Sequence, residues 1–444
     1  MRVMFLISDY QIEPLGLGYV FSALKKAGHE IGIIKTKYRA SLFQSIKDFK
    51  PDILGYSITT GWHNFYINLN KEIKKAFPKV KSIFGGPHAT YMPEMINEDG
   101  VDVVMRGECE QSFVNCLAVI EAGLNGFKRT VDPYPLEQDL DSLEFPDREL
   151  LYSYSENLNN PIANVMMSRG CKFACSFCYS SISHQMYKGQ KTVRYRSADN
   201  VIEECLEIKN RYPQKKMIFF QDDEFVIRDI EILGEFLNAY KGKIGLPFHC
   251  QFRAEQMTSA KALLLKEAGC ISVTFAIESG NELIRNKLLK KHLKDKDIFN
   301  CVDILKQVGL KFRSENMIGI PGETIDEALE TLDLNIKIKS DVAWCALFQP
   351  YPKTELGELC KSMLLWNGSY EGIEKDFFTS CPIKRDRTRE FNNLQKIFGL
   401  VVEYPILRPL VRGLIKLPEM ELTNWVSRKF KHYVYDHRLY EVGN

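Results

Sequence analysis

The sequence has no long hydrophobic run and no excess of charge of one sign. No stretch of about 18 uninterrupted apolar residues occurs in it, so no transmembrane helix is expected. The apolar part of its N-terminus, MRVMFLISDY, is too short for a secretory signal. A formal net charge of +2 argues against bulk electrostatic capture of nucleic acid. These absences predict a cytoplasmic location and no nucleic-acid partner.

Cysteine, in contrast, is frequent, with 12 residues in a chain of 444. Where no export signal is present, closely spaced cysteines are more often metal ligands than disulfide partners, and isolated ones are usually small buried residues. The length predicts two or three domains. A hydrophobic fraction of 45% is enough to give each of them a core.

Residues 1–125 alternate short apolar runs with helical patterns. Their order predicts a parallel, doubly wound sheet of the flavodoxin or Rossmann type, whose ligand binds beyond the carboxyl ends of the strands. The GxGxxG fingerprint is absent, so a nicotinamide dinucleotide is not expected. Strands are predicted at Val3–Ile7, Ile31–Ile34, Ile53–Ile58, Ser82–Phe84 and Val101–Met105, and helices at Gly16–Ala27 and Phe65–Phe77.

Three phrases of this segment, EPLGLGY (13–19), GGPHA (85–89) and VDVVMRGE (101–108), resemble the cobalamin-binding domain that precedes many radical S-adenosylmethionine (SAM) enzymes. Methionine-synthase-type domains carry a DxHxxG motif whose histidine binds cobalt, whereas here Asp9 is followed by no histidine before Gly16. The alternative is a flavodoxin-like domain without a ligand. The resemblance implies that five residues lie near the cobalamin nucleotide tail: Ser57, Gly85, Gly86, Gly107 and Glu108.

The most specific motif is a trio of cysteines, Cys171, Cys175 and Cys178, spaced C-x3-C-x2-C. Thiolates are the preferred ligands of iron–sulfur clusters, and three of them leave one iron of a four-iron cluster open to SAM. A zinc site usually needs four closed ligands, and nearby His184 does not fit its spacing. A ferredoxin-like cluster would need Cys205 or Cys250 as a fourth ligand. The motif resembles that of radical SAM enzymes, which implies a 4Fe-4S cluster and places Phe177 against the SAM adenine.

Six strand–helix units surround this motif and predict a partial (β/α)6 barrel with its chemistry at the carboxyl ends of the strands. Polar groups gather at those ends, from Gln221 to Gln349. The predicted strands are Ile162–Met167, Met217–Phe220, Phe248–Phe252, Ser272–Ile277, Lys311–Met317 and Val342–Phe348. The predicted helices are Ala198–Arg211, Asp229–Tyr240, Ser259–Ala268, Lys296–Val308 and Thr324–Ile338.

The phrases FFQDDEF, FAIESGNE, MIGIPGET and FQPYPKTEL match radical SAM enzymes with cobalamin domains, in the same order. The resemblance implies that Asp222 and Asp223 lie near the SAM amino group or the substrate. It brings Arg253 and Glu278, with Ser279 beside it, to the SAM carboxylate or ribose. It also brings the backbone of Gly319–Pro321, including Gly319 and Pro321, near the adenine. Each acid is alternatively a simple helix N-cap.

Residues 126–156 contain three prolines and are predicted to be a linker, and 157–360 form the barrel. Residues 361–444 form a mostly helical C-terminal extension, a lid or a substrate region. Within it, Lys396–Pro418 is apolar with basic residues between, so it either packs on the barrel or contacts a membrane surface or a lipid-like substrate.

The resemblance implies an enzyme that uses cobalamin, SAM and the cluster. In this class a 5′-deoxyadenosyl radical activates a substrate carbon, which then takes a methyl group from cobalt. The expected partners are a small-molecule or lipid-like substrate and an electron donor such as flavodoxin or ferredoxin. Alternatives are a cyclase or rearrangement enzyme of the same family and a cobalamin or redox sensor. A tRNA methylthiotransferase would need more N-terminal cysteines than Cys109 and Cys116.

Overall fold

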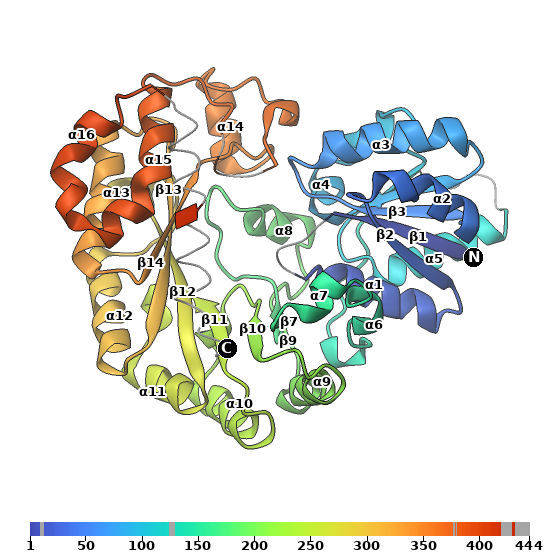
Figure 1. The fold of residues 1–444 in the computed structure, drawn as a ribbon, viewed down its shortest axis with the longest axis horizontal. Coiled ribbons are helices and arrows are strands. Elements are labelled where there is room, and N and C mark those ends of the chain that lie inside the picture. The colour runs from blue at the N-terminus through green and yellow to red at the C-terminus, as the bar shows by residue number, and fades with distance from the viewer. Residues whose placement is uncertain (9–12, 124–128, 376–377, 379, 419–428, 431–444) are drawn as a thin grey trace. The chain divides into compact units, whose positions relative to one another are not determined.

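A computed structural model describes residues 1–8, 13–123, 129–375, 378, 380–418 and 429–430. The chain forms two compact units, Met1–Asn160 and Pro161–Asn444 (Figure 1). Each unit is built on its own parallel sheet of six strands, and this confirms the predicted α/β class with two sheet domains.

The sheet of the first unit has the strand order β2-β1-β3-β4-β5-β6. All neighbouring strands run parallel, so the order reverses beside β1, as in a doubly wound fold. At such a switch point the chain leaves room for a ligand beyond the strand ends. The strands are β1 (Arg2–Ile7), β2 (Glu30–Lys35), β3 (Ile53–Ser57), β4 (Lys81–Gly85), β5 (Val103–Met105) and β6 (Thr130–Val131).

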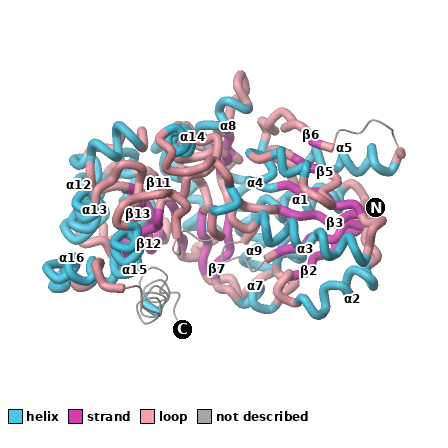
Figure 2. Tube along the Cα trace, turned by 90° about the horizontal axis from the view of Figure 1, so that it is seen from above, coloured by secondary structure: helices cyan, strands magenta, loops and turns pink. Residues whose placement is uncertain are grey.

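Helices cover both faces of this sheet (Figure 2). Phe5 of β1 packs against Phe21 of α1 and Phe113 of α5 on one face, at 4.8 and 5.8 Å between ring centroids. Leu42 of α2 and Ile73 of α3 are buried against the other face. The helices are α1 (Leu15–Lys26), α2 (Arg39–Phe49), α3 (His63–Ala76), α4 (Gly86–Tyr91) and α5 (Glu110–Glu121).

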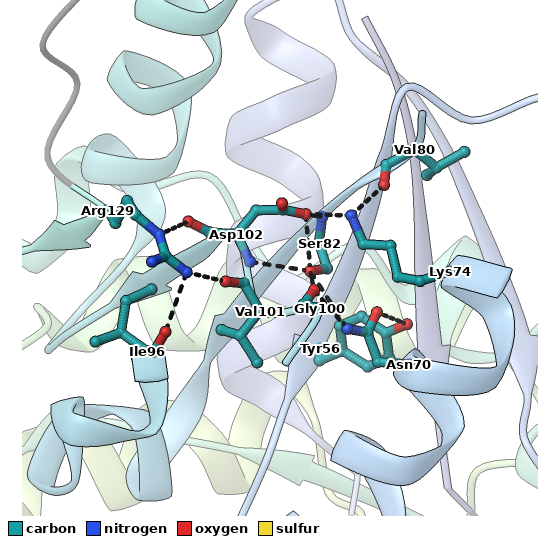
Figure 3. A network of polar contacts seen from close by, with 10 residues as sticks. All are labelled: Tyr56, Asn70, Lys74, Val80, Ser82, Ile96, Gly100, Val101, Asp102 and Arg129. Atoms are coloured by element: carbon teal, nitrogen blue, oxygen red, sulfur yellow. Dashed lines mark hydrogen bonds and ion pairs between the residues drawn. The ribbon is translucent and has the colours of Figure 1, made fainter. Parts of the chain in front are cut away.

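A polar network ties α3 to the amino ends of β4 and β5 (Figure 3). The Asp102 carboxylate accepts hydrogen bonds from the Ser82 amide, at 2.7 Å, and from the Lys74 ammonium. The Asn70 side chain accepts from the Tyr56 hydroxyl at 3.0 Å. Ser82 and Asp102 lie at the amino ends of β4 and β5, so the network fastens this end of the sheet to α3.

The described part of 126–156, predicted to be a linker, packs onto the first unit. β6 extends the sheet by pairing with β5, and Arg148 donates to Glu13 at 2.6 Å. Leu151 is buried. The apolar side chains of this stretch are too scattered in the sequence to show a helix or strand period, although they pack against the first unit. Two short helices follow, α6 (Arg148–Leu151) and α7 (Ser155–Asn159).

The sheet of the second unit has the order β14-β13-β12-β11-β10-β7, all parallel. Among the described strands β7 and β14 are its two edges, so the barrel is partial, as predicted. Strands β8 and β9 pair antiparallel in a separate two-stranded sheet, and the cysteine loop and α8 (Ser180–Met186) lie between them in the chain. The strands are β7 (Ile162–Val165), β8 (Ser168–Arg169), β9 (Arg194–Tyr195), β10 (Met217–Phe220), β11 (Phe248–Phe252), β12 (Cys270–Glu278), β13 (Lys311–Ile318) and β14 (Val342–Leu347).

Helices follow the strands and bury one apolar face against the sheet, around a core that includes Phe220, Phe236 and Phe275. Side-chain caps mark where several begin: Ser197 accepts from the Asn200 amide, and Thr324 forms a capping box with Glu327. The helices are α8 (Ser180–Met186), α9 (Ala198–Arg211), α10 (Ile230–Lys243), α11 (Ser259–Glu267), α12 (Asp295–Gln307) and α13 (Ile325–Ile338).

Helix α14 (Glu355–Ser362) spans the predicted boundary at residue 360, and the C-terminal extension contains α15 (Thr388–Glu403) and α16 (Val411–Leu414). Helix α15 packs on β14 and α13 through an apolar face that includes Phe398. Beyond it the side chain of Ile406 is 85% exposed. No helix among the described residues is long and apolar enough to cross a membrane.

Candidate functional site

The residues predicted to contact a cobalamin tail lie at the carboxyl ends of neighbouring strands. Ser57 is the last residue of β3 and is aligned with Gly85, the last residue of β4. Gly86 has a φ of +87°, and a Cβ there would lie 2.7 Å from the Ile58 amide nitrogen. Only glycine fits this position, so the backbone approaches closely at this end of the sheet.

Gly107 and Glu108 follow β5 and complete this group. The Gly107 amide donates to the Thr90 hydroxyl at 3.0 Å, and its carbonyl accepts from the Cys109 thiol at 3.3 Å. The Cys109 sulfur lies 4.0 Å from the position that a Cβ of Gly85 would take. The structure therefore brings all five predicted residues together, and the surface they share is mostly backbone and glycine.

Two buried histidines support the same strand ends. The rings of His63 and His88 stack at 4.5 Å between centroids, and Thr60 pairs with Nδ1 of His88 at 3.1 Å. Burial lowers the pKa of His63 to about 4, which keeps its ring neutral. His88, whose role the sequence left open, therefore packs the loops beneath the glycines. Asp9 lies outside the described residues.

In the second unit, the cysteine loop follows β8, which pairs with β9. Gly170 has a φ of +86°, and a Cβ there would lie 2.3 Å from the Thr192 carbonyl oxygen. No side chain fits between the two strands at this point, so a glycine is required. The pairing of β8 with β9 thereby fixes the direction in which the cysteine loop leaves β8.

The three cysteines are close enough to interact electrostatically. Burial raises the pKa of Cys171 to about 12 and also raises that of Cys175, and the nearby Cys178 adds to both effects. Cys175 is only 8% exposed. His184 Nε2 lies 2.6 Å from the Cys171 carbonyl oxygen, so its ring contacts the backbone of the loop.

Hydrogen bonds to distant segments hold this loop in place. The Ser176 amide donates to the Leu289 carbonyl at 3.1 Å, and its hydroxyl donates to the Leu288 carbonyl at 2.6 Å. The Ser176 carbonyl accepts from the Leu356 amide at 2.9 Å. Two segments that are far away in the sequence thus fix the residue between Cys175 and Phe177.

Arg253, which follows β11, is directed at the cysteine loop. Its Nη1 lies 3.5 Å from the Cys175 sulfur, and its guanidinium stacks 3.8 Å from the Phe173 ring centroid. Its other nitrogens donate to Glu255 and to the Lys291 carbonyl. In the structure this guanidinium supports the ligand loop, and its contact with the SAM carboxylate or ribose stays a prediction.

Three consecutive acidic residues follow β10 and differ in burial and in the groups that they contact. Asp222 is buried and accepts from the Met167 amide at 3.1 Å and from the Ser168 hydroxyl, so it anchors the start of the cysteine loop. Burial raises its pKa to about 6. Asp223 is exposed, and its charge contributes to the raised pKa of Cys171. Of the two predicted residues, Asp223 is the one whose carboxylate is accessible.

Glu224, the third acid, accepts from the Arg253 amide at 2.8 Å. Burial raises its pKa to about 8, against the opposing charges of Arg253 and Lys291. Sequence reasoning does not single out Glu224, because nothing local shows which of three neighbouring acids turns inward.

The end of β12 carries a strained residue. Glu278 has a φ of +72°, which is rare for a residue with a side chain. Its carboxylate lies 3.6 Å from the Lys291 ammonium, and burial raises its pKa. Ser279 is fully buried, and its carbonyl accepts from Arg285 Nη1 at 2.7 Å. Glu278 is therefore held beside Lys291 and Ser279 beside Arg285, and the SAM contacts of both residues stay predictions.

The end of β13 is held by a carboxylate. Glu323 accepts from the Ile320 amide at 3.1 Å and from the Gly319 amide, and burial raises its pKa to about 8. Ile320, between Gly319 and Pro321, belongs to the same apolar cluster as Phe177. The residues predicted to contact adenine are thus brought together.

The donor set of the loop has the chemistry that an iron–sulfur cluster requires. Cysteine sulfur is the ligand type such a cluster takes, and the Arg253 guanidinium beside Cys175 suits thiolate ligation. Among the described residues no group of three or more His, Cys, Asp or Glu side chains lies close enough together to hold a single metal ion. The fit of the three cysteines to a cluster therefore rests on their donor chemistry.

Lys291 is the main residue that sequence reasoning missed. It lies in a run of basic residues before α12 that indicates an exposed turn, yet its side chain is only 4% exposed. Its charge, with that of Arg253, opposes the burial that raises the pKa of Cys175. No local signal distinguishes it from its neighbours Lys287, Lys290 and Lys294.

Comparison with known proteins agrees with this geometry. Residues 1–117 match the B12 binding domain family, and residues 165–334 match the radical SAM superfamily. The chain is 30% identical over 364 residues to the uncharacterized methyltransferase PH0819 of Pyrococcus horikoshii, covering 78% of each protein. It is 24% identical to the anaerobic magnesium-protoporphyrin IX monomethyl ester cyclase of Rubrivivax gelatinosus, covering 80% of this chain and 69% of the other.

Among solved structures, the fold matches that of the radical SAM methyltransferase TsrM from Kitasatospora setae, whose structure has cobalamin and a 4Fe-4S cluster bound. The TM-score is 0.66 at 16% identity, over 81% of this chain and 78% of that one. The cofactors of this chain are accordingly a 4Fe-4S cluster, SAM and cobalamin. The chain belongs to the radical SAM enzymes that carry an N-terminal B12-binding domain.

Proposed function

We propose that this protein is a cobalamin-dependent methyltransferase that methylates an unactivated carbon of a small-molecule substrate by radical SAM chemistry. The observation that carries the proposal is the combination, in one chain, of a B12-binding unit with a radical SAM unit whose loop offers three cysteines. The 30% identity to a protein named as a methyltransferase supports this outcome.

In the proposal Cys171, Cys175 and Cys178 hold the cluster, within a SAM-binding region 157–360. When bound, the cluster and SAM supply a 5′-deoxyadenosyl radical, and cobalamin supplies the methyl group. Five residues contact the bound SAM or the substrate: Asp222, Asp223, Arg253, Glu278 and Ser279. Asp222 and Arg253 also position the cysteine loop. The apolar cluster shared by Phe177 and Ile320, with the backbone of Gly319 and Pro321, receives the adenine.

The first unit, with 1–125 as its ligand-binding part, binds cobalamin through the strand ends that carry Ser57, Gly85, Gly86, Gly107 and Glu108. Close packing of backbone at Gly86 supports this role, since a large flat ligand needs a surface without protruding side chains. Residues 361–444 form the substrate region in this proposal.

A cyclase is the second candidate function. It is favoured by the 24% identity to the magnesium-protoporphyrin ester cyclase, over 80% of this chain. The two functions share the cluster, SAM and the radical, and differ in whether the product gains a methyl group or a ring.

Two partners complete the proposal. A low-potential donor such as flavodoxin or ferredoxin supplies the electron. The apolar side chains of Ile406, Leu410 and Leu417, which are 85, 58 and 45% exposed, support a peripheral contact with a membrane or a lipid-like substrate.

The test uses the full chain, reconstituted with iron and sulfide under anaerobic conditions and supplied with cobalamin, SAM and dithionite. It is expected to release 5′-deoxyadenosine and to transfer the carbon-13 label of methyl-labelled SAM to the extracted corrinoid. Cys175→Ala should reduce 5′-deoxyadenosine to background. Cys205→Ala, a buried cysteine of α9 outside the motif, is the matched control and should retain it.

If the wild-type protein held zinc, or if Cys175→Ala still cleaved SAM, radical chemistry at this loop would be refuted. If SAM were cleaved but no label reached the corrinoid, the cyclase or a rearrangement would replace methylation.

A further inference from the structure

The segment that carries Lys291 is built at a conformational cost. Lys290 and His292, on either side of it, have φ angles of +51° and +55°. Residues with side chains are strained in this conformation and persist in it only where the surroundings hold them. The segment follows a π-helical turn, Ile284–Leu288. Strain of this kind is typical of functional sites.

A fully buried arginine holds the segment in this shape. Arg285 is 0% exposed, and its guanidinium donates to the Ser279 and Leu293 carbonyls at 2.7 Å each and to Asp295. These bonds join the end of β12 to the start of α12 across the strained residues. The position of Lys291 is therefore fixed by the fold.

The same segment is bonded directly to the cysteine loop. Ser176 donates to the Leu289 carbonyl at 3.1 Å, and Arg253 bridges the Lys291 carbonyl to the Cys175 sulfur, which lies 3.5 Å from its Nη1. Arg253 thus places one cation beside the sulfur, and its bond to the Lys291 carbonyl holds a second cation, Lys291, in the segment next to the cysteine loop. Lys291 and Arg253 are both buried, with 4 and 5% of their surfaces exposed, so water screens their charges only weakly.

We propose that Lys291, together with Arg253, raises the reduction potential of the iron–sulfur cluster that Cys175 helps to hold. The inference rests on the proposed function only for the presence of that cluster. Reduction adds one electron, taken from an external donor of the flavodoxin or ferredoxin type, and no bond is made or broken. A buried cation beside a ligand sulfur stabilises the added negative charge, and charge and hydrogen bonds at the sulfurs set such potentials. Lys291 thus favours electron entry through its charge.

The experiment compares Lys291→Met with Lys287→Met in the full, reconstituted chain. Both remove one positive charge from the same segment, but Lys287 is exposed. A redox titration without SAM, followed by electron paramagnetic resonance, measures the reduction equilibrium. Coulomb energies at the dielectric of a protein site predict that Lys291→Met lowers the equilibrium constant at least about tenfold, which is about 59 mV for one electron. Lys287→Met should change it less than about twofold.

Two further variants test the direction in which the reduction equilibrium constant changes. Lys291→Arg keeps the charge and should titrate close to wild type. Glu278→Gln, measured at alkaline pH where the carboxyl is ionised, removes the anion 3.6 Å from Lys291 and should raise the equilibrium constant. This variant carries the test if Lys291→Met takes up too little iron, and an unchanged or lowered constant would then overturn the inference.

The inference is also overturned if Lys291→Met has full iron content and titrates like wild type. If the wild-type protein shows no reducible cluster at all, the proposed function fails instead. The two failures are therefore distinguishable.

Discussion

The two units present opposite kinds of surface at the carboxyl ends of their parallel strands. In the first unit the predicted site consists of three glycines, Ser57 and Glu108, and neutral rings such as His63 support it. In the second unit the site contains several buried charges, among them Arg253, Lys291 and Glu224. The first surface selects a ligand by shape and backbone contact, whereas the second acts through charge in a medium that screens it poorly.

Backbone strain follows the same division. In the first unit the left-handed residues at the strand ends are Gly86 and Gly107, which adopt this conformation freely. In the second unit Glu278, Lys290 and His292 are also left-handed, although each carries a side chain. A glycine would relieve that strain but would remove the charge, so the second site retains side chains where the first needs none.

The largest expected effect tests whether the charged site also depends on a tight backbone. Gly170 and Gly189 both have a left-handed φ, +86° and +88°, but only at Gly170 does a Cβ meet backbone, 2.3 Å from the Thr192 oxygen. Gly189→Ala should cost about 1–2 kcal/mol from strain alone. Gly170→Ala should cost about 2 kcal/mol more and should abolish iron uptake, because the segment of Thr192 must move away from Gly170 and separate β8 from β9.

Thermal unfolding and iron content after reconstitution measure both variants. Equal melting temperatures and equal iron in the two proteins would show that the Thr192 contact does not constrain the loop.

A smaller effect is expected in the first unit, from a glycine that is not strained. A Cβ at Gly85 would find no atom closer than 3.9 Å, so Gly85→Ala should leave the melting temperature unchanged. Its methyl group would nevertheless project from the proposed cobalamin surface, and we expect cobalamin affinity to fall about tenfold. Retention of cobalamin, followed by its visible absorption, gives the measurement.

Gly242→Ala, at a helical glycine of α10 in the other unit with open space around it, serves as the control. Wild-type affinity in Gly85→Ala would mean that the ligand does not approach this strand end, and the contrast between the two sites would lose its first half.

Much of the fold could be predicted because its signals are local. Strands β10 and β11 and helix α9 have the bounds that apolar periodicity predicted. Helix α2 was missed because only Leu42 and Ile46 of its residues are buried, so its apolar stripe is too narrow to recognise. β6, with two residues, is too short for any period.

The site divides in the same manner. The three cysteines are close in sequence, so their spacing alone indicated the ligand loop. Lys291 is brought to that loop by bonds from Ser176 and Arg253, more than a hundred and nearly forty positions away. Such long-range contacts leave no local pattern, and the contact of Arg253 with Cys175 has none either.

The third expected effect is on the pH dependence of stability and concerns Asp222, the buried acid that anchors the charged site. Asp222 keeps its proton up to about pH 6 in the folded chain, compared with an ordinary value of 3.8, because burial disfavours the carboxylate. Between these values the folded chain binds more protons than the unfolded one, so the free energy of unfolding should fall as pH rises, by about 2–3 kcal/mol in all. Asp222→Asn should remove this part of the pH dependence, whereas Asp229→Asn, at an exposed acid nearby, should retain it. Urea titrations across this pH window measure the slopes, and parallel slopes for wild type and Asp222→Asn would show that burial does not hold the proton on this carboxyl. The glycine-built site of the first unit has no buried acid among the predicted residues, so substitutions there should leave this slope unchanged.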